Sequence, residues 1–102
     1  MSKIKTVEQG GSLNFIFNRG GKSISGWICN ITVKQYPDDP PLIARRIPAA
    51  KNEKRWIGYL TAEETYNLGE SVNSPYYLTA ILTNANNDEE IQTPIRFNVS
   101  PN

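Results

Sequence analysis

Residues 55–84, which read RWIGYLTAEETYNLGESVNSPYYLTAILTN, constrain the fold more than any other part of the chain. They contain a short apolar run, an acidic segment with helical character, a polar loop with Pro75, and a long alternating run. In the last run, apolar side chains recur at every second residue, as on one face of a β-strand: Tyr76, Leu78, Ala80 and Leu82. The region therefore predicts two strands joined by a short helix. It specifies architecture rather than chemistry.

The helix has a clear start signal and a clear stop signal. Thr61 followed by Glu64 matches a capping box, in which the hydroxyl and the carboxylate satisfy the first backbone amides of a helix. Gly69 follows the segment at the position that often ends a helix. We expect one short helical turn at about residues 62–68, crossing between strands.

The remaining strands are predicted from the same period of two. Alternating apolar residues recur over residues 12–18, 27–34 and 91–99, and a shorter strand fits residues 42–47 before Pro48. The polar stretch 84–89 predicts a hairpin between residues 76–83 and 91–99. The predicted core consists of Phe15, Phe17, Trp27, Ile31, Val33, Trp56, Leu60, Leu78, Leu82, Ile95 and Phe97.

The length of 102 residues fits one domain, 1–102. About seven short strands with regular turn signals indicate an all-β, antiparallel β-sandwich. An eight-stranded barrel fits less well, because Pro40, Pro41, Pro48 and Pro94 would interrupt closed pairing. Residues 1–9 are expected to be either a flexible N-terminal arm or a strand that pairs with the sheet edge of a neighbour.

Composition excludes several classes of protein. Eleven basic and ten acidic residues give a net charge of +1, which argues against a dedicated nucleic-acid binder. A single cysteine, Cys29, allows no internal disulfide, so synthesis inside the cell is the simpler expectation. No apolar run is long enough for a membrane helix, and residues 1–11 lack the apolar core of a signal peptide.

Five motifs together resemble the immunoglobulin-like modules of tailed-phage virion proteins. In chain order they are GGSLNF, SISGWICNITVKQ, WIGYLTAEETYNL, YYLTAILTN and IRFNV. The nearest likeness is to the N-terminal domain of phage baseplate upper proteins, and it spans roughly residues 10–99. In that family the second strand follows a small polar step, matched here by Ser25 and Gly26 before Trp27. A turn with threonine and acidic residues precedes the tyrosine-bearing strand, matched by Thr61, Glu64 and Tyr76.

The resemblance implies an immunoglobulin-like sandwich of about seven strands and a non-enzymatic role in a virion. The family module usually heads a longer chain, whereas this sequence ends at Asn102, so a small adaptor subunit of the tail or baseplate is expected. It would be made in the host cytoplasm and dock in multiple copies on other virion structural proteins, or on copies of itself. Alternatives are a capsid cement or decoration protein, a carbohydrate- or receptor-binding module, and an inhibitor that acts on a host factor.

Candidate interface residues fall into two groups. Tyr36, Tyr59 and Tyr77 lie opposite the predicted buried faces and are expected to be exposed. Five of the eleven basic residues fall within the single segment 45–55, which makes it a candidate for contact with an acidic neighbour, although a solvated loop is the default interpretation: Arg45, Arg46, Lys51, Lys54 and Arg55.

No catalytic, cofactor or metal site is predicted. The sequence has no histidine to serve as a general base, and Cys29 falls on a predicted core face, where burial raises a thiol pKa. The acidic pairs at residues 38–39 and 88–90 do not have the spacing of a metal-binding loop and are ordinary turn chemistry.

Overall fold

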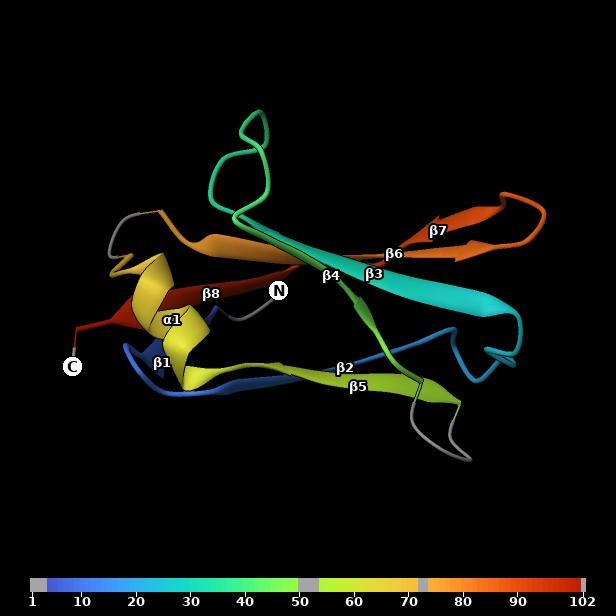
Figure 1. Ribbon diagram of the computed structural model, residues 1–102, viewed down its shortest axis with the longest axis horizontal. Helices are drawn as coiled ribbons and strands as arrows, with labels where there is room; N and C mark the ends of the chain where they lie inside the picture. Colours follow the sequence, from blue (N-terminus) through green and yellow to red (C-terminus); the bar gives the residue numbers. More distant parts are fainter. Residues whose placement is uncertain (1–3, 50–53, 72–73, 102) are drawn as a thin grey trace.

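The computed structural model describes residues 4–49, 54–71 and 74–101 and shows a mostly β protein in two layers (Figure 1). The predicted all-β class is confirmed, with eight strands in the described residues rather than about seven. The elements in chain order are β1 (Lys5–Glu8), β2 (Leu13–Asn18), β3 (Trp27–Lys34), β4 (Ile43–Ile47), β5 (Arg55–Leu60), α1 (Ala62–Leu68), β6 (Tyr76–Asn84), β7 (Glu89–Ile91) and β8 (Ile95–Ser100).

The strands divide unequally between two sheets. The main sheet has the order β1-β8-β6-β3-β4, with β7 also paired to β6, and the small sheet consists of β2 and β5 alone. Strands β3 and β6 form the centre of the main sheet through eight antiparallel pairs, from Trp27 opposite Asn84 to Lys34 opposite Tyr77. In the small sheet, Leu13 lies opposite Leu60 and Asn18 opposite Arg55.

The N-terminal segment differs from expectation. Strand β1 pairs in parallel with β8 of the same chain, from Lys5 opposite Phe97 to Glu8 opposite Ser100. Val7 then points inward and is buried in the core. Strand Lys5–Glu8 is therefore part of the main sheet, and the expectation of an entirely antiparallel sandwich is wrong at this ladder.

The core lies between the two sheets and is built from both inner faces. Of the predicted core residues, nine are buried: Phe15, Phe17, Ile31, Val33, Trp56, Leu60, Leu78, Leu82 and Phe97. Trp27 and Ile95 are only partly buried and pack against this cluster. The Arg19 guanidinium lies over the Trp27 ring, and Ile95 lines a groove beside β2.

The C-terminal hairpin is not the continuous alternating strand that the sequence predicted. Ile91 lies opposite Ile81, but Ile95 lies opposite Leu78, so residues 92–94 face only Thr79 and Ala80. Residues 92–94 thus contain one residue more than the partner strand, which is a β-bulge, and a bulge reverses the face on which the following side chains lie. Ile91 is consequently 66% exposed on the outer face, whereas Phe97 and Val99 are buried.

Helix α1 closes one end of the molecule, and its predicted capping box is confirmed. The Glu64 amide donates to the Thr61 hydroxyl at 3.1 Å, and the Thr61 amide donates to the Glu64 carboxylate at 2.9 Å. One face of the helix is tied to the chain before β2, because the buried Thr65 hydroxyl donates to the Gly11 carbonyl oxygen at 2.5 Å. The Tyr76 hydroxyl donates to the Leu68 carbonyl, with the Gly69 carbonyl oxygen 3.2 Å away. The helix is thereby fixed to both sheets.

Candidate functional site

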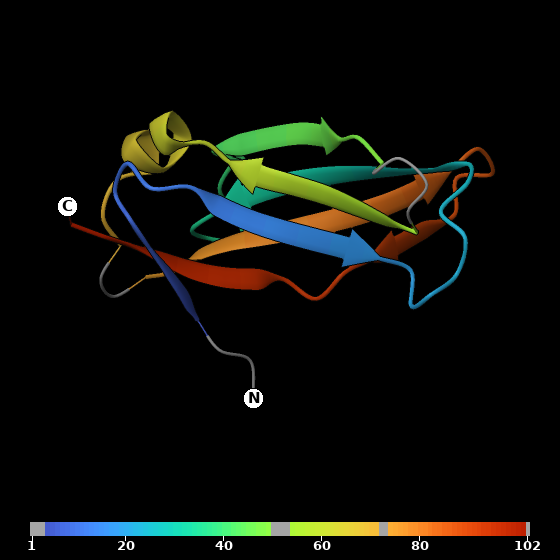
Figure 2. The ribbon, with the colours of Figure 1, turned by 90° about the horizontal axis from the view of Figure 1, so that it is seen from below.

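The outer face of the small sheet carries the most exposed apolar cross-strand pair among the strands. Ile16 and Ile57 lie directly opposite one another and are 52% and 46% exposed, and Tyr59 on the same face is 57% exposed. Figure 2 shows the two strands side by side in front of the larger layer. We call the outward residues of this sheet the β2–β5 face: Asn14, Ile16, Asn18, Arg55, Ile57 and Tyr59.

Strict alternation explains why these residues are outside. Every second residue of β2 and β5 points into the core, and the inward set includes two phenylalanines, a tryptophan and a glycine. Gly58 lies opposite Phe15, and the Phe15 ring covers it so closely that a Cβ atom on Gly58 would lie 2.6 Å from the ring. The inner positions are thus filled, and Ile16 and Ile57 have no place in the core.

The two edges of the small sheet differ. On the β5 side, the Arg45 guanidinium donates to the Tyr59 carbonyl, and Ala49 forms an isolated bridge with Trp56. On the β2 side, the described residues contribute no further strand, because β2 pairs with β5 alone. A groove of about 330 Å³ runs beside it, lined by Lys5, Asn14, Phe15, Ile16, Ile57 and Ile95.

The three predicted tyrosines do not form one platform. Tyr59 lies on the β2–β5 face, whereas Tyr36 and Tyr77 share a groove of about 290 Å³ with Pro37 and Pro75 in the main sheet, where β3 ends and β6 begins. Tyr36 is exposed, and its hydroxyl is 3.5 Å from the Ser74 hydroxyl. Tyr77 is only half-buried rather than exposed, because it stands on the outer face of β6 beside β3 and β8.

The predicted basic group is also dispersed. Arg45 points inward and forms an ion pair with Glu64 at 2.6 Å, whereas Arg46 points to the opposite side of β4. Lys54 and Arg55 are exposed at the start of β5, and Lys51 lies outside the described residues. Arg45 therefore fixes α1 to β4 and β5 instead of contributing to an exposed basic patch.

A cluster around Arg19 was not anticipated. The Arg19 guanidinium makes two parallel bonds of 3.0 Å to the Glu90 carboxylate, and it lies 4.0 Å from the centre of the Trp27 ring. A third bond of 2.7 Å reaches the Ser23 carbonyl. Arg19 follows β2 and Glu90 lies in β7, so the pair joins the two sheets at the end opposite α1. In the sequence, Arg19 is an arginine at a strand end and Glu90 an acidic residue near a hairpin. Many other arginine–carboxylate pairs would fit that description equally well, so this pair could not be predicted.

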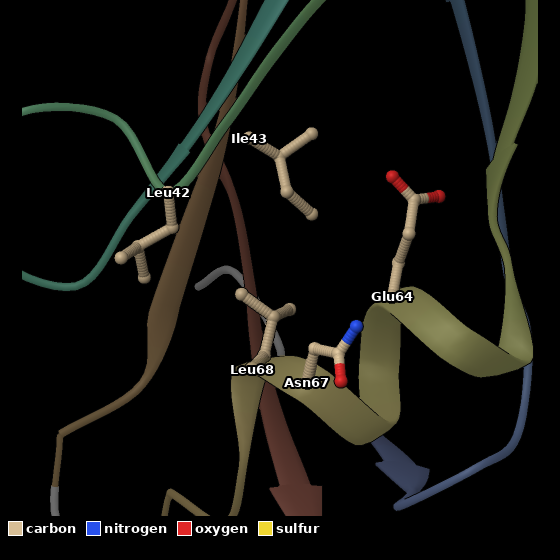
Figure 3. Close-up of a pocket in the computed structure, with 5 residues that line it drawn as sticks. All are labelled: Leu42, Ile43, Glu64, Asn67 and Leu68. Atoms are coloured by element: carbon tan, nitrogen blue, oxygen red, sulfur yellow. The ribbon is translucent and has the colours of Figure 1, made fainter.

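Figure 3 shows the hollow between α1 and the start of β4, where Leu42, Ile43 and Leu68 converge with Glu64 and Asn67. Its volume is about 250 Å³. Partial burial opposes ionisation of Glu64, but hydrogen bonds from Arg45 and Thr61 outweigh it and hold the pKa of this carboxyl below its usual value. Glu64 is therefore a structural carboxylate, committed to the helix cap and to Arg45.

The other chemically reactive side chain is Cys29. It is fully buried on β3, and burial raises the pKa of its thiol to about 11. A thiol in this state is a poor nucleophile at neutral pH. Among the described residues there is no group of three or more cysteine, histidine or acidic side chains that could hold a metal ion. The described part of the chain also has no helix long and apolar enough to cross a membrane.

The feature that stands out is therefore a surface, formed by the β2–β5 face and the open edge of β2. Comparison with known proteins adds nothing to this geometry. No protein-family model, no curated protein and no solved structure matches the chain.

Proposed function

We propose that this protein is a non-enzymatic structural module that docks in multiple copies within a phage particle, as a small adaptor of the tail or baseplate. The observation that carries the proposal is the β2–β5 face, where Ile16, Ile57 and Tyr59 are exposed beside an open strand edge. Exposed apolar side chains grouped at an unpaired edge are typical of surfaces that associate with other chains.

We further propose that the sandwich is immunoglobulin-like. In that fold, the third, sixth and seventh strands share one sheet and the second and fifth lie in the other. With β1 counted as the first strand and the short β7 left out, β3, β6 and β8 are the third, sixth and seventh strands and share the main sheet, while β2 and β5 are the second and fifth and form the small sheet, which is compatible with this pattern. Tyr76 supports it as well, because its hydroxyl bonds back to Leu68 at the corner before β6, as a tyrosine corner does.

The virion assignment rests on the sequence resemblance to immunoglobulin-like modules of phage baseplate proteins. Repetition around a symmetric tail or shell would let weak single contacts hold together through avidity. A capsid cement or decoration protein is the alternative within the same class.

The test is the composition of purified particles from the phage that carries this gene. We expect quantitative mass spectrometry to find the chain in several copies per particle, and a cryo-EM map to place it at the tail or baseplate. Absence from intact particles overturns the proposal, and density confined to the capsid surface supports the cement protein instead.

A second candidate function is recognition of a carbohydrate or receptor, and the groove between Tyr36 and Tyr77 favours it. Aromatic faces beside polar groups are suited to stacking on a sugar ring, and Gln35 and Ser74 supply polar groups there. NMR titration with host cell-wall oligosaccharides tests this candidate. Shifts at Tyr77 that are lost in Tyr36→Ala but kept in Tyr66→Ala, a change at an exposed tyrosine of α1, would support it.

A further inference from the structure

The open edge of β2 differs chemically from every other edge in the described residues. Each of the other edge strands carries at least one charged residue: Lys5 and Glu8 on β1, Arg45 and Arg46 on β4, Glu89 and Glu90 on β7, and Arg55 on β5. Charged side chains on an edge strand discourage pairing with another chain. Strand β2 reads LNFIFN and has none.

Its length and composition suit pairing. Six residues is an ordinary strand length, and no proline or glycine interrupts it. In an antiparallel ladder, every second residue of an edge strand directs its N–H and C=O groups outward. Those of β2 meet no further strand in the described chain.

We propose that the partner of this edge is a second copy of the same chain, which pairs β2 with β2 in antiparallel orientation about a two-fold axis. The inference deepens the proposed docking function, on which its biological setting depends, by naming the partner of the β2–β5 face. The two small sheets would join into one four-stranded sheet in the order β5-β2-β2-β5.

Face matching limits the possible registers. The two copies keep their inner faces on the same side of the joined sheet only if each residue meets one of the same parity. Placing Ile16 on the axis meets this condition, because Ile16 then lies opposite Ile16 of the other copy, and Asn14 lies opposite Asn18.

This register makes the face self-complementary. Since Ile16 already lies opposite Ile57 within each chain, the joined sheet carries a row of four isoleucines across its centre. On either side, Asn14 and Asn18 of the two copies face each other, and asparagine amides can both donate and accept hydrogen bonds. The charged residue of the β2–β5 face, Arg55, stands on the outer strand, away from the axis.

Competing pairings lack these properties. A copy of β4 against β4 would bring arginines of like charge together, and like charges directly opposite one another destabilise a sheet. Strand β7 has only three residues, two of them glutamates. Strand β2 is therefore favoured over the other edges on charge and on length together.

Sedimentation velocity across a concentration series tests the association. We expect a reversible monomer–dimer equilibrium in the native chain and a dissociation constant at least about tenfold weaker in Ile16→Lys, because two ammonium groups would then face each other on the axis. Ile91→Lys, at an even more exposed isoleucine of β7, is the matched control and should leave the equilibrium unchanged. Circular dichroism checks that both variants are folded.

Cysteine cross-linking tests the register. With Ile16→Cys, the two thiols lie directly opposite one another, within the separation that a disulfide spans. With Ile57→Cys they are three strand spacings apart, or about 14 Å. Oxidation should give a covalent dimer only in Ile16→Cys.

A chain that stays monomeric at its highest soluble concentration, or a dimer unaffected by Ile16→Lys, overturns this inference. A dimer that is lost in Ile16→Lys but cross-links more readily through Ile57→Cys overturns the register. None of these results decides whether the protein is found in particles, so failure of the pairing and failure of the proposed function are distinguishable.

Discussion

The two sheets share one core but differ in how they end at the surface. The main sheet has edges that carry charged residues, a bulge within residues 92–94, and ion pairs near both ends of the molecule, Arg45 with Glu64 and Arg19 with Glu90. The small sheet has only two strands, one open uncharged edge and a pair of exposed isoleucines. Both ion pairs also involve the small sheet, since Arg19 follows β2 and Arg45 donates to the Tyr59 carbonyl of β5. The two sheets therefore differ chiefly in their surfaces, because only the small sheet combines an uncharged open edge with a pair of exposed isoleucines.

The most disruptive test asks whether the small sheet is stabilised independently. Trp56 of β5 and Phe97 of β8 are both buried in the common core. We expect Trp56→Ala and Phe97→Ala each to lower the free energy of unfolding by about 3–5 kcal/mol, the usual cost of removing a buried aromatic ring. Urea unfolding followed by tryptophan fluorescence, which comes from Trp27 alone in Trp56→Ala, and by circular dichroism should show one coincident transition in both variants.

Two separate transitions in Trp56→Ala would contradict the shared core. In that case the small sheet would be a unit that unfolds alone, and the contrast between the sheets would concern stability as well as surface chemistry.

Gly58 tests the packing beneath the exposed face. A methyl group there would lie 2.6 Å and 2.7 Å from two ring atoms of Phe15. Gly58→Ala should therefore cost about 1–3 kcal/mol through overpacking. Combining it with Phe15→Leu, which shortens the opposing side chain, should be less costly than the sum of the two single changes. If the two losses in free energy of unfolding, measured by urea unfolding, were strictly additive, the Phe15 ring would accommodate the added methyl group without strain.

Tyr76 tests the connection between the main sheet and α1. Tyr76→Phe removes the donor to the Leu68 carbonyl and should lower the free energy of unfolding by about 1 kcal/mol. Tyr66→Phe is the matched control. Tyr66 is an exposed residue of α1, so removing its hydroxyl should change the free energy of unfolding very little. If Tyr76→Phe and Tyr66→Phe lowered the free energy of unfolding equally, the Tyr76 hydroxyl would have no special structural role.

The Arg45–Glu64 pair should have the smallest effect. Glu64 has a folded-state pKa below its unfolded value, so its contribution is fully present above an unfolded pKa of about 4.3 and is lost as the pH falls through the folded pKa. Because both side chains are partly exposed, we expect Glu64→Gln to cost less than about 1 kcal/mol at pH 7. The difference in free energy of unfolding between the native chain and Glu64→Gln should become smaller below pH 4.

Stability measured across pH gives the sign of this effect directly. Glu63→Gln, at the exposed neighbour, should show no comparable loss. If the difference in free energy of unfolding between the native chain and Glu64→Gln grew as the pH fell, the carboxylate would not stabilise the fold in its charged form.

Local patterns predicted most of the architecture because they depend on neighbours in sequence. The capping box at Thr61 and Glu64 and the alternation in β2, β3 and β6 were sufficient to place those elements. The β1–β8 ladder joins residues more than ninety positions apart, so no local pattern could show it. The bulge was missed because Ile91 and Ile95 have the same parity, and only the partner strand shows that they lie on opposite faces.

The candidate site was predicted less well than the fold. Tyr36 and Tyr59 are exposed as expected, but they lie in different places, and Arg45 is held in an ion pair. Ile16 and Ile57 were not selected: alternation puts Ile16 on the face opposite Phe15 and Phe17, but a single apolar side chain on an outer strand face is ordinary and does not indicate a site. The two residues form one exposed apolar pair because they lie directly opposite each other in a sheet of only two strands. Neither strand's sequence alone shows this pairing or the number of strands in the sheet.

The parallel pairing of β1 with β8 also determines how the molecule carries load. The chain enters the sheet at Lys5 and leaves it at Ser100, and the two strands run in the same direction with those residues at opposite ends of the ladder. Tension between these ends would therefore pull the strands lengthwise past each other and strain all the hydrogen bonds of the ladder at once. A domain loaded in shear in this way resists extension far better than one whose strands are peeled apart bond by bond.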